Sequence, residues 1–204
     1  MNQAAYQQTP IPQRRKSNDR KGEILGAASW LFRNKGFLRT SLNDIALRVG
    51  INKATIFYYF PNKDYLLYEV LCESLRVGIK EIQLIMLSSP PEERLKNVIK
   101  GHLKFNLRDS GFGGISAFEQ KNLSPKLRKS YVPLRDEYEG LIRETVQEAM
   151  SAGQTKQGDV RVQTRILLGA LNSINRWYKQ DGPLSIEEVG DEICNLILCD
   201  RPPK

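Results

Sequence analysis

Side chains that can bind a nucleic acid lie close together between residues 41 and 63. They are basic, small, hydroxyl-bearing or aromatic: Lys53, Ala54, Thr55, Phe57, Tyr58 and Tyr59. Lysine can donate to guanine, alanine and threonine can contact a thymine methyl group, and a tyrosine hydroxyl can donate to a phosphate. Lys63 begins the next expected helix, where its ammonium and the helix N-terminus can hold a phosphate together. The other interpretation of residues 57–60 is core packing, which we expect for Phe60 and for one face of its neighbours.

Three helices are expected to position this stretch. Residues 19–35 repeat apolar side chains at helical spacing, and two short helices are predicted over 42–49 and 53–60. The expected core between them is Ile45, Ala46, Val49, Ile51 and Ile56. Two short helices joined by a glycine turn, after a longer helix, are typical of a helix–turn–helix DNA-binding domain.

Local signals mark the ends of the two short helices. Ser41 can act as an N-cap with Asp44 three residues later, which is a capping box with aspartate in place of glutamate. Gly50 tolerates the left-handed backbone that ends a helix, and Asn52 can cap the following one.

The net charge of the chain is concentrated at the same end. Residues 1–63 contain eleven Lys and Arg against three Asp and Glu, whereas residues 64–204 contain equal numbers of the two. This asymmetry favours an N-terminal module that binds a polyanion. The alternative is a lysine-rich surface that is merely solvated.

Composition argues against several other classes of protein. The three cysteines have no metal-binding or disulfide spacing, and a single histidine leaves little room for a catalytic triad. No apolar run reaches the ~18 residues of a membrane span, and residues 1–13 lack the apolar stretch of a secretory signal. We therefore expect a soluble, cytoplasmic protein that is not an enzyme and has no cofactor, metal or membrane segment.

The remaining sequence also reads as helices, so the predicted fold class is all-α with about nine helices. The later helices are expected over 63–87, 92–109, 115–121, 125–152, 159–179 and 185–198. Three parts follow: a flexible basic arm over 1–18 with Arg14–Lys16, a helix–turn–helix domain over 19–63, and a larger helical domain over 64–204.

Residues 20–67 resemble the TetR family of bacterial transcriptional regulators. The stretch that carries the resemblance is "ILGAASWLFRNKGFLRTSLNDIALRVGINKATIFYYFPNKDYLL". The resemblance implies contacts to DNA, and we include Ser41 and Tyr58 among them: Ser41, Asn43, Lys53, Ala54, Thr55, Phe57, Tyr58, Tyr59 and Lys63. The sequence departs from the family at Phe57, where tyrosine is common, so a phosphate hydrogen bond is expected from Tyr59 instead.

The resemblance also implies a homodimer with an effector-binding domain. We expect the last two helices, over 159–179 and 185–198, to pack against their symmetry mates, and double-stranded operator DNA to be the main partner. An apolar cavity for a hydrophobic small molecule is predicted from these residues: Leu103, Leu107, Phe112, Phe118, Tyr131, Tyr138 and Leu171.

The C-terminal part indicates which effector to expect. "RDEYEGLIRETVQEAMSAGQ" and "GALNSINRWYKQDGPLSIEEVGDEICNLIL" resemble the branch of the family that regulates fatty-acid and sterol catabolism and responds to acyl-CoA thioesters. Three alternatives remain: a regulator of drug efflux, a small helical lipid-binding enzyme, and a non-specific nucleoid-type DNA binder. His102 is interpreted as a structural or surface residue rather than a ligand.

Overall fold

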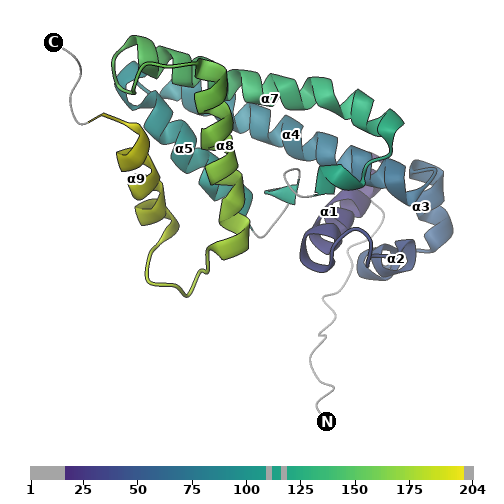
Figure 1. Cartoon of the computed structure of the whole chain (residues 1–204). Coiled ribbons are helices and arrows are strands. Elements are labelled where there is room, and N and C mark those ends of the chain that lie inside the picture. Colours follow the sequence, from purple (N-terminus) through teal and green to yellow (C-terminus); the bar gives the residue numbers. More distant parts are fainter. Residues whose placement is uncertain (1–16, 109–111, 116–118, 200–204) are drawn as a thin grey trace.

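The computed structural model of the chain describes residues 17–108, 112–115 and 119–199, and these residues form an all-helical molecule (Figure 1). Eight α-helices and one 3-10 helix are present in these ranges: α1 Ser17–Lys35, α2 Leu42–Val49, α3 Lys53–Tyr59, α4 Lys63–Ser88, α5 Pro91–Leu107, η1 Gln120–Asn122, α7 Pro125–Ser151, α8 Val160–Trp177 and α9 Ile186–Ile197. The all-α prediction is therefore confirmed.

Helices α1, α2 and α3 form a small head at one end of the molecule (Figure 1). α2 packs against both α1 and α3, and the apolar faces of these helices enclose Ile24, Phe32, Ile45 and Ile56, none of which is exposed. Burying four such side chains is worth about 1.5–3 kcal/mol each. A core of this kind gives the two short helices a fixed relative orientation that neither would hold alone.

Helix α4 joins the head to a body built from α5, α7, α8 and α9. It contacts α1 in the head and packs along α7 and α5, while α5 packs against α8 and α9 (Figure 1). Fully buried side chains run through both parts, among them Leu66 and Leu71 on α4 and Ile99 on α5. Helix α4 therefore connects the core of the head to the core of the body.

Several details differ from the sequence prediction. α1 begins at Ser17 rather than at residue 19, so the last two residues of the expected arm are helical, and the rest of the arm, with Arg14–Lys16, lies outside the described residues. Of the helix expected over 115–121, the structure describes Ile115, Glu119 and η1.

Helix α8 buries one side and exposes the other. Leu167, Leu171 and Ile174 are buried, whereas Ala170 is exposed and Trp177 is 54% exposed. In the parts of the chain that the structure describes, no helix is long and apolar enough to cross a membrane.

Candidate nucleic-acid interface and effector cavity

Helix α2 is fixed at both ends by the residues that the sequence predicts. The Ser41 hydroxyl accepts from the Asp44 N–H at 3.1 Å, and the Asp44 carboxylate accepts from the Ser41 N–H at 2.8 Å, which completes the capping box. Gly50 ends the helix in the left-handed conformation, with φ of 71°. A side chain is strained at this φ, so the turn between α2 and α3 favours glycine.

Helix α3 starts from a second cap and presents most of its side chains outward. The Asn52 carboxamide oxygen accepts from the Ala54 N–H at 2.9 Å. Ile56 points into the head and is not exposed, and Phe60 at the helix end is equally buried. The prediction of core packing for Phe60 is therefore confirmed.

The outward face of the head contains most of the predicted DNA contacts. Six of them are exposed: Ser41, Asn43, Lys53, Ala54, Phe57 and Tyr58. Thr55, Tyr59 and Lys63 are half-buried. Tyr58 is 82% exposed and meets the ring of Tyr59 edge to face, while the Lys53 ammonium lies 5.7 Å from the centre of the Phe57 ring. An exposed hydroxyl, ammonium and aromatic ring on one short helix suit a groove of duplex DNA.

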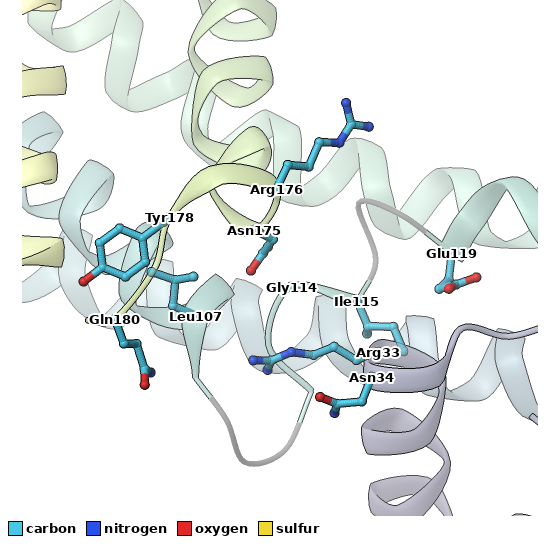
Figure 2. A pocket seen from close by; sticks show the side chains of 10 residues that line it. All are labelled: Arg33, Asn34, Leu107, Gly114, Ile115, Glu119, Asn175, Arg176, Tyr178 and Gln180. Carbon is cyan, nitrogen blue, oxygen red and sulfur yellow. The ribbon is translucent and has the colours of Figure 1, made fainter. Parts of the chain in front are cut away.

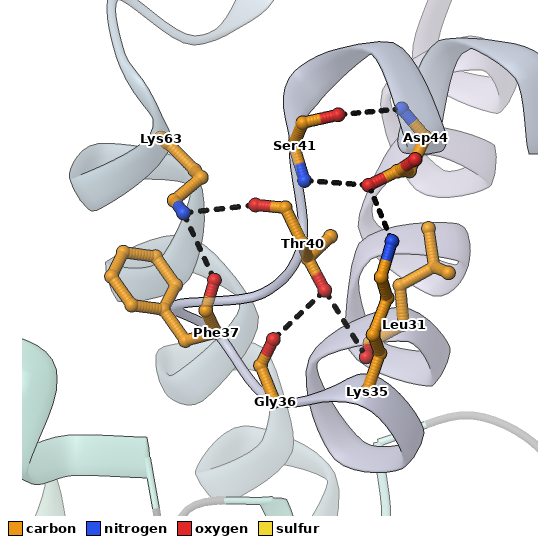
Figure 3. Close-up of polar contacts among 8 residues, drawn as sticks. All are labelled: Leu31, Lys35, Gly36, Phe37, Thr40, Ser41, Asp44 and Lys63. Atoms are coloured by element: carbon orange, nitrogen blue, oxygen red, sulfur yellow. Dashed lines mark hydrogen bonds and ion pairs between the residues drawn. The ribbon is translucent and has the colours of Figure 1, made fainter.

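Lys63 makes contacts inside the head that the sequence did not reveal. Its ammonium donates to the carbonyl oxygens of Phe37 and Thr40, both at 2.9 Å, and lies 4.2 Å from the centre of the Phe37 ring (Figure 3). Partial burial lowers the pKa of Lys63. The side chain thus fixes the loop between α1 and α2 to the start of α4, and its contact with phosphate stays a prediction.

Asp44 also connects helices α1 and α2. Its carboxylate lies 2.9 Å from the Lys35 ammonium as well as accepting from Ser41 (Figure 3). The hydrogen bond from the Ser41 backbone and the neighbouring Lys35 lower the pKa of Asp44 to about 2. The carboxylate is therefore charged at neutral pH, and it holds the first turn of α2 against the end of α1.

A cavity of about 260 Å³ lies in the body among α4, α5, α7 and α8, and His102 is one of the buried residues that line it. The Nδ1 atom of His102 is 2.7 Å from the Tyr138 hydroxyl, and its Nε2 atom is 3.1 Å from the side-chain Oδ1 atom of Asn172 and 2.8 Å from the side-chain Nδ2 atom of Asn106. Burial lowers the pKa of His102 to about 4 and raises that of Tyr138. At neutral pH the imidazole is uncharged, so it can donate at one nitrogen and accept at the other.

The structural interpretation of His102 did not anticipate this network. The signal available in the sequence was the pair His102 and Asn106, four residues apart on a helix whose other inward residues are apolar. Two polar side chains one turn apart on an apolar face need partners when buried, so the pair indicates a polar cluster inside the body.

The predicted effector residues are divided among different places. Tyr131 and Tyr138 line the His102 cavity, whereas Leu107 lines another cavity nearer the head. Leu103 and Leu171 are fully buried in the core and line neither cavity. The carbonyl oxygen of Phe112 accepts from the Ser74 hydroxyl at 2.6 Å, and Phe118 lies outside the described residues.

The His102 cavity is more polar than the expected apolar one. Besides His102, Asn106 and Asn172, its lining includes Arg135 and Arg165. The amides and the imidazole can be accommodated here because they satisfy one another through hydrogen bonds. The described residues contain no group of His, Cys, Asp or Glu side chains that could hold a metal ion.

A helix–turn–helix head on an all-helical body with an internal cavity defines a class of protein: DNA-binding regulators that carry a separate sensing domain. Comparison with known families identifies which one. Residues 24–70 match the family described as "Bacterial regulatory proteins, tetR family", and residues 88–199 match "Tetracyclin repressor-like, C-terminal domain". The second match alone covers more than half of the chain, so the chain belongs to the TetR family of transcriptional regulators, and it is not an enzyme.

Individual relatives agree with this assignment. The transcriptional repressor KstR2 of Mycolicibacterium smegmatis is 27% identical over 182 residues, which are 88% of this chain and 89% of that protein. The crystal structure of PfmR, a TetR-family regulator from Thermus thermophilus, has a TM-score of 0.74 at 30% identity and covers 86% of this chain and 96% of its own. AibR in complex with isovaleryl coenzyme A and operator DNA has a TM-score of 0.80 at 23% identity, covering 87% and 97%.

Proposed function

We propose that the chain is a homodimeric repressor that binds a pseudo-palindromic operator through α3 and releases it when a small molecule enters the body. The observation that carries this proposal is the exposed face of α3, with Lys53, Phe57 and Tyr58 turned outward from a head whose core is closed. The domain limits proposed with it are 19–63 for the head and 64–204 for the body, and the site of action is the cytoplasm.

An unpartnered stripe on α8 supports the dimer. Val162, Ile166 and Trp177 are 53%, 68% and 54% exposed, and the small, exposed Gly169 and Ala170 lie between them. The spacing of these residues places them along one side of a helix, and small residues let a second helix approach closely. On α9, Leu196 is 86% exposed. A twofold contact through α8 and α9 would bury this apolar surface and present two copies of α3 to half-sites about 34–36 Å apart.

The effector is proposed to be an acyl-CoA or a related lipid thioester. The relatives support this class, because AibR was crystallised with isovaleryl coenzyme A and a relative in Bacillus subtilis is named as a fatty acid metabolism regulator. The His102 cavity offers hydrogen-bond donors and acceptors for the polar part of such a ligand beside apolar residues such as Leu75 and Leu168. Ligand and operator would then oppose each other with a coupling free energy of about 1–3 kcal/mol in both directions.

The DNA-binding part is tested by titrating the protein with its own promoter and with random duplex at about 150 mM salt. A specific regulator is expected to bind the promoter at least about 10³-fold more tightly. Equal affinity for both duplexes would replace the proposal with a non-specific, nucleoid-type binder.

The effector is tested by native mass spectrometry of the purified protein, followed by a titration of the identified compound against the protein–operator complex. A fatty-acyl or sterol-derived thioester that releases the operator would support the proposal. A cationic, drug-like compound that does so would redirect it to control of efflux, and turnover of a bound thioester would show an enzyme.

A further inference from the structure

The size of the His102 cavity limits which ligands it can hold. Its volume of about 260 Å³ is below the roughly 300–1,000 Å³ of sites for drug-sized ligands. A water molecule occupies about 30 Å³ in the liquid, and by this measure the cavity has room for about nine non-hydrogen atoms. A short acyl group fits this space, whereas a long fatty-acyl chain or a sterol nucleus exceeds it.

The Gly114 loop, residues 112–115, separates this cavity from a larger one between α1 and the end of α8 (Figure 2). The two cavities share none of their described lining residues, and Asn106 lines the first and Asn175 the second. A β-carbon on Gly114 would lie 2.5 Å from the Asn106 carbonyl oxygen and 2.9 Å from the Asn175 Nδ2 atom. The loop is thus packed too tightly for a ligand chain to pass from one cavity into the other at this point.

The hydrogen bonds of His102 determine which groups of the lining can donate to a ligand. The Nε2 atom lies 2.8 Å from the Asn106 Nδ2 atom, which can only donate, and 3.1 Å from the Asn172 Oδ1 atom, which can only accept. One nitrogen of a neutral imidazole cannot serve both, and the shorter contact favours acceptance from Asn106. The proton of the imidazole is then on Nδ1, which donates to the Tyr138 oxygen at 2.7 Å.

This arrangement leaves the hydroxyl hydrogen of Tyr138 without an acceptor among the residues that the structure describes. Tyr138 is 8% exposed and lines the cavity. Burial, and to a lesser degree the charge of Glu81, raise the pKa of Tyr138, so the hydroxyl keeps its hydrogen at neutral pH. A buried donor needs an acceptor, and a ligand oxygen in the cavity can supply one.

The charges around the cavity indicate that this ligand oxygen is uncharged. Burial and a neighbouring carboxylate disfavour a further negative charge beside the hydroxyl. The two cations of the lining, Arg135 and Arg165, have side chains that are 43% and 75% exposed, and they lie 2.7 Å from Asp136 and 3.8 Å from Glu139. A carboxylate inside the cavity would therefore have no buried cation among the described lining residues.

We propose that the His102 cavity binds the acyl group of a short-chain acyl thioester, and that the Tyr138 hydroxyl donates to its uncharged carbonyl oxygen. The inference rests on the proposed function, because it takes an acyl-CoA as the effector. It narrows that class to acyl groups of about eight carbons or fewer. Tyr138 selects for the carbonyl oxygen, and the small volume selects against long chains.

The proposal is tested by isothermal titration of the full-length protein with three coenzyme A derivatives. Butyryl coenzyme A has a short chain and the carbonyl oxygen, S-butyl coenzyme A lacks only that oxygen, and lauroyl coenzyme A has a long chain. We expect butyryl coenzyme A to bind at least about 10-fold more tightly than each of the other two. Equal or tighter binding of either one would overturn the proposal.

A tyrosine variant tests the role of the hydroxyl. Tyr138→Phe keeps the ring, and it is expected to weaken butyryl coenzyme A at least about 10-fold while leaving the affinity for S-butyl coenzyme A unchanged. Tyr178→Phe is the matched control, because Tyr178 is half-buried and lines the other cavity (Figure 2), so neither affinity should change. Unchanged binding of butyryl coenzyme A by Tyr138→Phe would overturn the role of Tyr138.

Binding of S-butyl coenzyme A also shows whether Tyr138→Phe is folded. If the variant bound neither derivative and its thermal unfolding transition were lost, the comparison of butyryl with S-butyl coenzyme A on the parent protein would decide the proposal. That comparison changes only the ligand, so it does not depend on the stability of a variant.

Failure of this inference and failure of the proposed function give different results. If lauroyl coenzyme A binds most tightly and releases the operator, the proposed effector class stands and the short-chain proposal is wrong. If none of the three derivatives binds, the proposed effector class is wrong and the short-chain proposal fails with it. Operator affinity without any effector tests the DNA-binding part alone.

Discussion

Two lysines of the head have different structural environments and therefore different expected roles. Lys53 is exposed at the start of α3, whereas Lys63 is half-buried and donates to the carbonyl oxygens of Phe37 and Thr40. The sequence predicted both as contacts with DNA, because a lysine at the start of a helix looks alike in either role. Only the path of the loop between α1 and α2 distinguishes them, and that path depends on packing against α4.

Substitution of Lys53 should therefore change operator binding, whereas substitution of Lys63 should change the stability of the fold. Lys53→Ala is expected to weaken operator binding by about 1–3 kcal/mol and to relax the base preference, with no change in melting temperature. Lys63→Ala removes two hydrogen bonds from a charged donor, so it should lower the free energy of unfolding by about 1–3 kcal/mol. Fluorescence anisotropy and thermal unfolding measure the two effects, and an unchanged melting temperature in Lys63→Ala would contradict the structural role.

The pKa of His102 predicts how the stability of the body depends on pH. Its value of about 4 lies below the ordinary 6.5, so the unfolded chain binds a proton that the folded chain excludes between these pH values. Stability should therefore be constant above pH 6.5 as far as this group is concerned, and should fall as pH drops toward 4. Since one pKa unit is worth about 1.4 kcal/mol, the loss amounts to a few kcal/mol.

The comparison that isolates this effect is His102→Gln, which keeps a neutral polar side chain beside Tyr138 and Asn172. Urea unfolding at pH 7.5, 6, 5 and 4.5 should show a shallower pH dependence for the variant than for the parent protein. If the free energy of unfolding changed with pH in the same way for both proteins, His102 would be accessible to protons in the folded state. Asp44, with its lowered pKa, contributes stability that is lost only at lower pH, so it does not distort this range.

At the scale of the element, the sequence predicted helices best where short-range chemistry fixes their ends. α2 spans the predicted residues because a capping box and a left-handed glycine lie at its two termini, and both depend on residues within three positions. The outward face of α8 was harder to predict. Ala170 and Trp177 share the helical spacing of the buried Leu167 and Ile174, so periodicity alone cannot tell core from interface.

The capping box of α2 makes a prediction about this element. Ser41→Ala removes the acceptor for the Asp44 N–H, and loss of an N-cap costs about 1 kcal/mol. We expect a corresponding fall in the free energy of unfolding by urea. Ser130→Ala, at an exposed serine within α7, is the control and should change it by less than about 0.5 kcal/mol. Equal effects of the two substitutions would show that the cap does not stabilise the head.

At the scale of the whole molecule, the cavities were the part that the sequence predicted least well. Tyr131 and Tyr138 face inward from one helix and line one cavity, and their contact with an effector stays a prediction. The cavity at the head is different: Arg33 and Asn175 are far apart in the sequence and come together only when α1 and the end of α8 lie on opposite sides of the Gly114 loop. The spacing of residues along the sequence does not predict which distant segments line one cavity in the folded chain.

At this scale, the exposed stripe on α8 supports the dimer proposed above and allows it to be tested. Ile166 is 68% exposed in the middle of the α8 stripe, and Leu84 on α4 is 65% exposed outside it. A charge placed at Ile166 would be buried without a partner in a dimer that packs through α8, at a cost of several kcal/mol, whereas a charge at Leu84 would remain in water. Ile166→Asp should therefore elute as a monomer in size-exclusion chromatography with light scattering, and Leu84→Asp as a dimer.

Operator binding should follow the oligomeric state in this pair of variants. A dimer binds both half-sites in one event, because the second α3 is held at high effective concentration next to its groove. The monomeric Ile166→Asp protein, with α3 itself unchanged, is expected to lose operator affinity by at least 10²-fold, while Leu84→Asp retains it. If Ile166→Asp remained dimeric and bound the operator normally, the subunits would associate through another face, and the spacing of about 34–36 Å between half-sites would no longer follow from α8.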